Sequence, residues 1–135
     1  MAHKHIIYMM LVDAAARAGD AASLQAYLPL LEQLAARDDH RPYLAVARRA
    51  LGVLCRLKED YDEAKVQLNQ ALEVFEELGF HWQVGRTLAD IAELALAQSD
   101  ATVAGDYFSR ALTKFEAMQA GPDAERTRAA LETLG

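Results

Sequence analysis

The chain has 135 residues and a formal net charge of −6, and 53% of its residues are hydrophobic while only 7 are glycine and 3 are proline. This length suffices for one hydrophobic core, and the composition, rich in Ala, Leu, Glu and Arg, is typical of packed helices. The acidic balance disfavours direct nucleic-acid binding, and the single Cys55 excludes an internal disulfide and is compatible with a reducing cytoplasm. We therefore expect one all-α domain, residues 1–135, located in the cytoplasm.

The first predicted helix covers residues 4–18, and its longest apolar run, Ile6–Val12, is too short to cross a membrane. Basic residues before this run and the small residues Ala16–Ala18 after it resemble a signal peptide with its cleavage site. Against that interpretation, Asp13 and Arg17 interrupt the apolar region, and the segment already follows the repeat described below. We therefore interpret it as part of the fold.

Six further helices are predicted from apolar residues at three- and four-residue spacing. They cover residues 21–37, 42–58, 61–78, 83–98, 101–119 and 123–133. Pro42 suits the first turn of its helix, and Gly79 supplies the left-handed residue that ends many helices. Pro29 lies inside the second helix, where it removes a hydrogen bond and should kink the helix.

Three aspartates, Asp20, Asp60 and Asp100, recur at intervals of 40 residues, and the apolar residues around them recur at the same interval. A fixed long period indicates one helix pair that is copied and stacked. Each aspartate precedes a predicted helix, so we interpret it as an N-cap, and Glu63 completes a capping-box-like arrangement with Asp60. Carboxylates on successive repeats, roughly 8–10 Å apart, are too dispersed to bind one metal ion.

Small residues at fixed offsets distinguish between the families of helix-pair repeats. In two units they stand 12 and then 7 residues apart, at Gly52, Ala64 and Ala71 and at Ala92, Ala104 and Ala111. This looks like the tetratricopeptide pattern and not like the HEAT or armadillo pattern, although the first unit has larger residues at these positions. The resemblance implies a right-handed all-α solenoid of three helix pairs, at about 4–41, 42–81 and 82–121, plus a C-terminal capping helix at 123–133.

The repeat is longer than the commoner length of about 34 residues. Its closing segments, Phe75–Gly79 and Phe115–Met118, resemble those in the tetratricopeptide arrays of large bacterial regulators, such as LuxR-type transcription activators and cyclase-linked signalling proteins. The resemblance implies a non-enzymatic scaffold that binds proteins or peptides in regulation or signalling and needs no cofactor. Two alternatives stay open: a domain that senses a small molecule, and a homo-oligomerisation module. No phosphate loop, nucleophile elbow or paired-carboxylate spacing indicates an enzyme.

In tetratricopeptide arrays the first helix of each pair lines a concave groove, which by resemblance would bind a peptide. The groove positions carried over to this chain are Arg17, Val46, Arg49, Val53, Arg56, Arg86, Ala89 and Glu93. Arg49 and Arg56 lie on a predicted helix that has basic residues and no acidic one, which favours an acidic peptide segment as the partner. The alternative is that these charges form a solvated face and pair with their neighbours. No asparagine occupies the positions that grip a C-terminal carboxylate in chaperone-binding arrays, which argues against that function.

The N-terminal helix is predicted to be apolar on all sides, and such a helix needs burial on several sides. We therefore expect either that the chain associates with itself there or that upstream repeats of a longer parent chain have been lost. The residues expected at this contact are Ile6, Ile7, Met9 and Met10. The last helix has a polar face and reads as a cap.

The remaining reactive or aromatic side chains give weak signals. We expect His40 and His81 to be exposed in inter-repeat turns, and no group of residues has the spacing of a metal site. Cys55 lies on an apolar stripe and is expected to be a buried structural thiol. Phe80 and Trp82 are expected to pack at the start of their helix and not to stack on a ligand.

Overall fold

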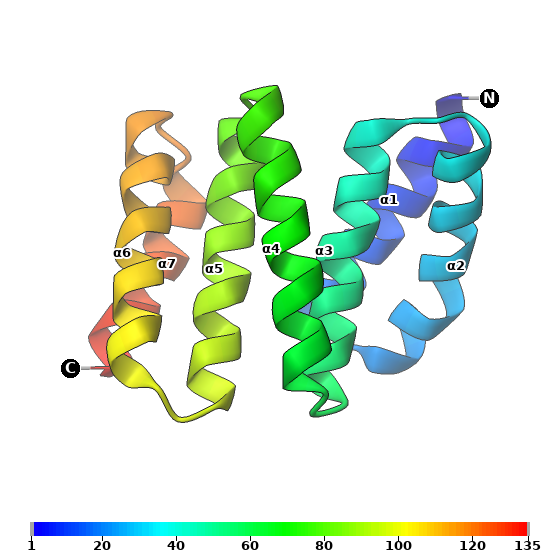
Figure 1. Ribbon diagram of the computed structural model, residues 1–135. Helices are drawn as coiled ribbons and strands as arrows, with labels where there is room; N and C mark the ends of the chain where they lie inside the picture. Colours follow the sequence, from blue (N-terminus) through cyan, green and yellow to red (C-terminus); the bar gives the residue numbers. More distant parts are fainter. Residues whose placement is uncertain (1, 135) are drawn as a thin grey trace. The chain divides into compact units, whose positions relative to one another are not determined.

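The computed structural model describes residues 2–134, with side chains described from Ile6 onward. This part of the chain forms seven α-helices and no strand (Figure 1). The helices are α1 (Ala2–Ala18), α2 (Ala21–Arg37), α3 (Arg41–Leu57), α4 (Tyr61–Leu78), α5 (His81–Ala97), α6 (Ala101–Ala117) and α7 (Gly121–Leu134). The predicted all-α class is confirmed, and each predicted boundary lies within two residues of the observed one. Pro29 lies inside α2, which continues on both sides of it, so the proline does not end the helix.

The six turns between the helices share one geometry that recurs every 20 residues. At each turn one residue has a positive φ, and these residues are Gly19, Asp39, Glu59, Gly79, Ser99 and Gln119. The next residue donates its N–H to the carbonyl five residues earlier, as in Asp20 N to Ala15 O at 2.9 Å and Asp60 N to Cys55 O at 2.8 Å. This is a Schellman ending, and its last residue also starts the next helix. The structural unit is therefore one helix plus one turn, and the 40-residue period is two such units.

The predicted N-caps are confirmed. Asp20, Asp60 and Asp100 accept hydrogen bonds from the backbone N–H three residues later, at 3.1, 3.4 and 3.1 Å. The predicted capping box at Asp60 is wrong, because the Asp60 N–H is already used by the Schellman bond and the Glu63 carboxylate accepts from Gln67 at 2.8 Å. Such a turn leaves the reciprocal bond without a donor.

Asp20 gives a pH-dependent contribution to stability that an asparagine cap would lack. Hydrogen bonds from the Ser23 hydroxyl and N–H hold the pKa of Asp20 below its usual value of 3.8. A carboxyl whose folded-state pKa is lowered stabilises the fold above its unfolded pKa, and this contribution is lost as the pH falls through the folded pKa. We expect the stability advantage of the native chain over Asp20→Asn, measured by urea unfolding, to shrink as the pH is lowered from 7 through the acid range. A difference that stays constant down to pH 2 would contradict this assignment.

The chain divides into two compact units, residues 1–74 and 75–135, with the division inside α4. In the first unit α1 packs against α2 and α3. The helices α3 and α4 approach closely at Gly52, where a Cβ would lie 3.3 Å from Ala64 O. This contact bears out the interpretation that small residues allow the helices of a pair to cross. The expectation of one single domain stays a prediction.

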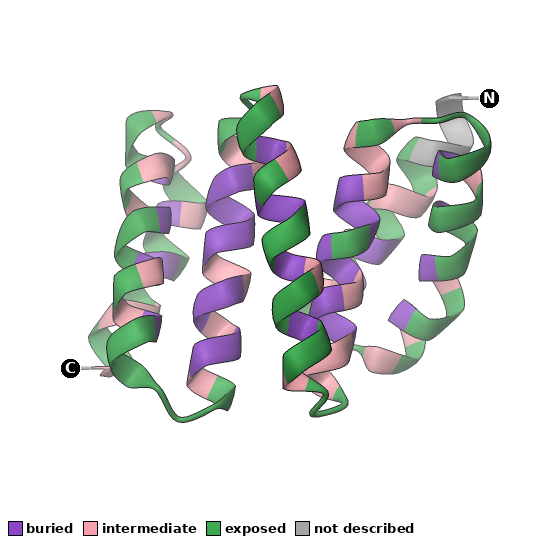
Figure 2. Ribbon diagram, viewed as in Figure 1, coloured by how far each residue is buried: buried purple, intermediate pink, exposed green. Residues whose placement is uncertain are grey.

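In the second unit α5 packs against α6, and α6 packs against α7. Most of α5 is buried, whereas the outer side of α6 is exposed (Figure 2). The core around Ala92 and Phe108 is closed by Leu131 and Leu134 of α7, and the charged residues of α7 lie on its exposed side. The last helix therefore covers the core with its apolar side and presents a polar surface, as a cap does.

Candidate interaction surfaces

Two arginines share one aspartate where α1 lies beside α3 in the first unit. Asp13 Oδ1 is 3.4 Å from Arg49 Nη2, and Asp13 Oδ2 is 3.5 Å from Arg17 Nε. The side chain of Arg49 is only 4% exposed, whereas that of Arg17 is 37% exposed. A nearly buried guanidinium needs a partner, and α1 supplies that partner. We use the name α1–α3 face for Asp13, Arg17, Arg49 and Arg56.

The basic ends of α1 and α3 lie together. Arg17 and Arg56 each occupy the last turn of their helix, and a Cβ on Gly19 would be 3.8 Å from Leu57, so these two ends are neighbours. Arg56 is half-buried, and no carboxylate of the described residues pairs with it. The α1–α3 face therefore carries three guanidinium groups and one carboxylate, an excess of positive charge in a chain of net charge −6.

The structure places the other predicted groove residues at differing depths. Val46 and Val53 are buried in α3, so they support the α1–α3 face from beneath. In the second unit Arg86 is buried and its guanidinium lies 5.3 Å from the centre of the Trp82 ring, while Ala89 and Glu93 are half-buried. Arg48, on the basic helix α3, points elsewhere and donates to Gln70 at 2.6 Å. Peptide binding at these positions stays a prediction.

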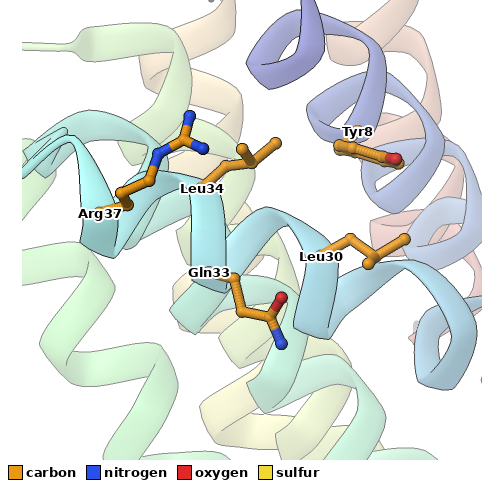
Figure 3. A pocket seen from close by; sticks show the side chains of 5 residues that line it. All are labelled: Tyr8, Leu30, Gln33, Leu34 and Arg37. Carbon is orange, nitrogen blue, oxygen red and sulfur yellow. The ribbon is translucent and has the colours of Figure 1, made fainter.

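The residues expected at the self-association contact divide in the same way. Ile6, Ile7 and Met10 are exposed on α1, whereas Met9 is half-buried. Leu11, which the sequence did not single out, is also exposed. Beside them a hollow of about 270 Å³ opens between α1 and α2. Tyr8 faces it from α1, and Leu30, Gln33, Leu34 and Arg37 line it from α2 (Figure 3).

The second unit has a different hollow, of about 350 Å³, at the turn between α6 and α7. It is lined by Phe115, Glu116, Gln119, Ala120, Gly121, Ala124 and Arg128. An ion pair of 3.1 Å between Arg128 and Glu116 lies beside it. Trp82 Nε1 donates to Asp123 Oδ2 at 2.9 Å, so the indole joins the start of α5 to α7. Trp82 thus has a cross-helix contact that its sequence position did not predict.

Two expectations about single side chains are wrong. His40 is half-buried and not exposed, because its Nδ1 accepts from Tyr43 N at 3.3 Å and its ring stacks on the Tyr43 ring at 4.0 Å. Histidine therefore caps α3 where the other pairs use aspartate. Cys55 is half-buried and not fully buried, and burial, together with Asp60 and Glu63, raises the pKa of its thiol. A raised thiol pKa disfavours the reactive thiolate.

The residues that the structure describes offer no metal or membrane element. No group of three or more His, Cys, Asp or Glu side chains in this part of the chain is arranged to hold a metal ion. Among the same residues no helix has the length and apolar character to span a bilayer. The arrangement can bind other molecules through charge on the α1–α3 face and through apolar contact on α1.

These features define the class of all-α proteins built from repeated helix pairs, in which neighbouring pairs stack. The family model for the tetratricopeptide repeat matches residues 5–77, more than half of the chain, so the chain belongs to the tetratricopeptide repeat family. Tetratricopeptide repeats generally mediate protein–protein interactions and are typically non-enzymatic. A comparison with curated proteins found no match.

Proposed function

We propose that the chain is a non-enzymatic adaptor that binds another protein or a peptide through the α1–α3 face. The observation that carries the proposal is the charge imbalance on this face, where Asp13 neutralises one guanidinium group and Arg56 has no carboxylate partner among the described residues. The fold supports the proposal, because its family mediates protein–protein interactions. The resemblance of the closing segments to bacterial regulators places the adaptor in a cytoplasmic regulatory or signalling system.

The chemistry of the face favours an acidic segment in the partner. Guanidinium groups bind carboxylates with two parallel hydrogen bonds, and Arg17 and Arg56 are the arginines on this face that solvent reaches. Arg49 cannot serve in this way while it is buried against Asp13, so its role is to hold that carboxylate between the two helices. The partner's carboxylates would therefore meet Arg56 first and compete with Asp13 for Arg17.

A peptide selection tests this function. Random peptides displayed on phage are selected on the purified chain, and the affinity of the best peptide is then measured by fluorescence anisotropy. We expect enrichment of Asp and Glu in the selected sequences. The double variant Arg17→Glu/Arg56→Glu should weaken binding by about 100-fold, since each lost charge-assisted contact is worth at least about 1.4 kcal/mol.

Lys65→Glu/Arg110→Glu is the matched control for this experiment. Both residues are exposed, on α4 and α6, and each double variant changes the net charge from −6 to −10, because every reversal adds −2. The control should bind the peptide with close to native affinity at physiological salt, where distant surface charges are screened. Equal losses in both variants, or selected peptides without acidic enrichment, would refute binding at the α1–α3 face.

A further inference from the structure

The exposed side of α1 presents a continuous apolar surface. With 100° of rotation per residue, Ile6, Ile7, Met10 and Leu11 fall within one arc of the helix, and all four are exposed. Met10 is 61% exposed and Ile7 is 54% exposed. No charged residue occurs between Ile6 and Val12. We call these four residues the α1 outer face.

The repeat shows what such a surface does elsewhere in the first unit. Forty residues later, α3 has Val46, Ala47 and Ala50 at the positions of Ile6, Ile7 and Met10, and these three residues are only 3% exposed. α3 packs against α1 and α2, so the α1–α2 helix pair lies over α3. The α1 outer face is therefore the stacking surface of a repeat, and no helix of the described residues lies over it.

The surface also has relief. The hollow between α1 and α2 lies next to the α1 outer face, because Tyr8, on its α1 side, is one turn from Leu11. Leu30, on its α2 side, is itself exposed. The only charged group that lines the hollow is Arg37, whose Nε is 3.1 Å from Asp38 Oδ1, so its charge is neutralised locally. Projecting side chains such as Met10 and an apolar hollow on one surface are what knobs-into-holes packing requires.

We propose that the α1 outer face binds the same face of a second copy of this chain, so that two α1–α2 helix pairs form a four-helix interface. The apolar run favours this occupant, because two chains of net charge −6 can meet there without bringing like charges together. Head-to-tail growth would need a matching apolar surface on α7. The exposed residues Glu125, Arg126 and Arg128 of α7 do not supply one, so the contact closes as a dimer.

Sedimentation velocity across a concentration series tests the proposal. The native chain should sediment as a species of about twice 14.9 kDa at high concentration and dissociate on dilution. Ile7→Glu/Met10→Glu should raise the dimer dissociation constant by about 100-fold or more, since like charges would then face each other across an apolar contact. Both residues are exposed, so the monomer should keep its fold, which helical circular dichroism and the thermal midpoint check.

Val66→Glu/Val103→Glu is the matched control, because these valines are exposed, at 47% and 40%, on α4 and α6. The control should dimerise like the native chain. A native chain that stays monomeric up to about 1 mM would overturn the proposal. So would a dimer that the α1 variant leaves intact, or one that the control variant dissociates equally. This test is independent of the peptide experiment, which probes a different set of α1 and α3 residues.

Discussion

Phe115→Ala is expected to lower the free energy of unfolding by about 3–5 kcal/mol, the usual cost of deleting a buried aromatic ring. The Phe115 side chain is 1% exposed, and a Cβ placed on Gly85 would lie 2.7 Å from its Cε1 atom. The ring therefore fills space that the absent side chain of Gly85 leaves open. Removing the ring creates a cavity beside a glycine, which has no side chain that could move in.

Urea unfolding followed by circular dichroism measures this loss. The control is Val103→Ala on α6, the same helix, where the side chain is 40% exposed and truncation should change the stability by less than about 0.5 kcal/mol. A loss below about 1 kcal/mol for Phe115→Ala would mean that the ring does not fill this part of the core.

Adding one methyl group at Gly52 should destabilise the protein by about 1–3 kcal/mol. A Cβ at this position would lie 2.6 Å from Leu68 Cγ and 3.3 Å from Ala64 O. Leu68 is fully buried and the Ala64 carbonyl belongs to the α4 backbone, so neither can retreat cheaply. This steric cost outweighs the gain of up to about 1 kcal/mol that alanine normally brings to a helix interior.

Gly105→Ala makes the same chemical change with the opposite expected sign. A Cβ there would lie 3.7 Å from Leu134 Cδ1, an ordinary contact, so the helix propensity of alanine should raise the stability by about 0.5–1 kcal/mol. A double-mutant cycle isolates the clash at Gly52: in a Leu68→Ala background, the cost of Gly52→Ala should fall by about 1 kcal/mol or more. Stabilisation by Gly52→Ala alone would contradict the close approach of α3 and α4.

The helices and their aspartate caps could be predicted from the sequence because both depend on short-range patterns. Apolar residues three and four positions apart mark the buried stripe of a helix, and a carboxylate bonds to a backbone N–H three residues away. The small residues at Gly52 and Ala64 also identified the closest helix contact. Each of these signals lies within one helix pair.

The turns were harder to predict, because only two of the six use glycine at the positive-φ position. Glu59 and Ser99 adopt φ values of 64° and 62° that their residue types seldom take. Their signal was positional: they lie 20 and 60 residues before or after Gly79, at multiples of the 20-residue unit. The cap on α3 was missed for a similar reason, since histidine is not among the preferred capping residues.

The charged site depended on contacts between helices that one sequence does not specify. Arg49 and Asp13 are 36 residues apart, and their ion pair requires a particular rotation of α1 against α3. The basic character of α3 was therefore visible, but the burial of Arg49 and the exposure of Arg17 were not. The bond from Trp82 to Asp123, 41 residues away, was missed for the same reason.

The central claim is that a partner binds the α1–α3 face of the first unit. Hydrogen exchange measured by mass spectrometry, with and without the selected acidic peptide, tests it most directly, because protection reports which backbone amides become less accessible on binding. Binding should slow exchange in the last turns of α1 and α3, around Arg17 and Arg56, and leave α6 and α7 unchanged. Protection confined to α6 and α7, or none in α1 and α3 at saturating peptide, would contradict the claim.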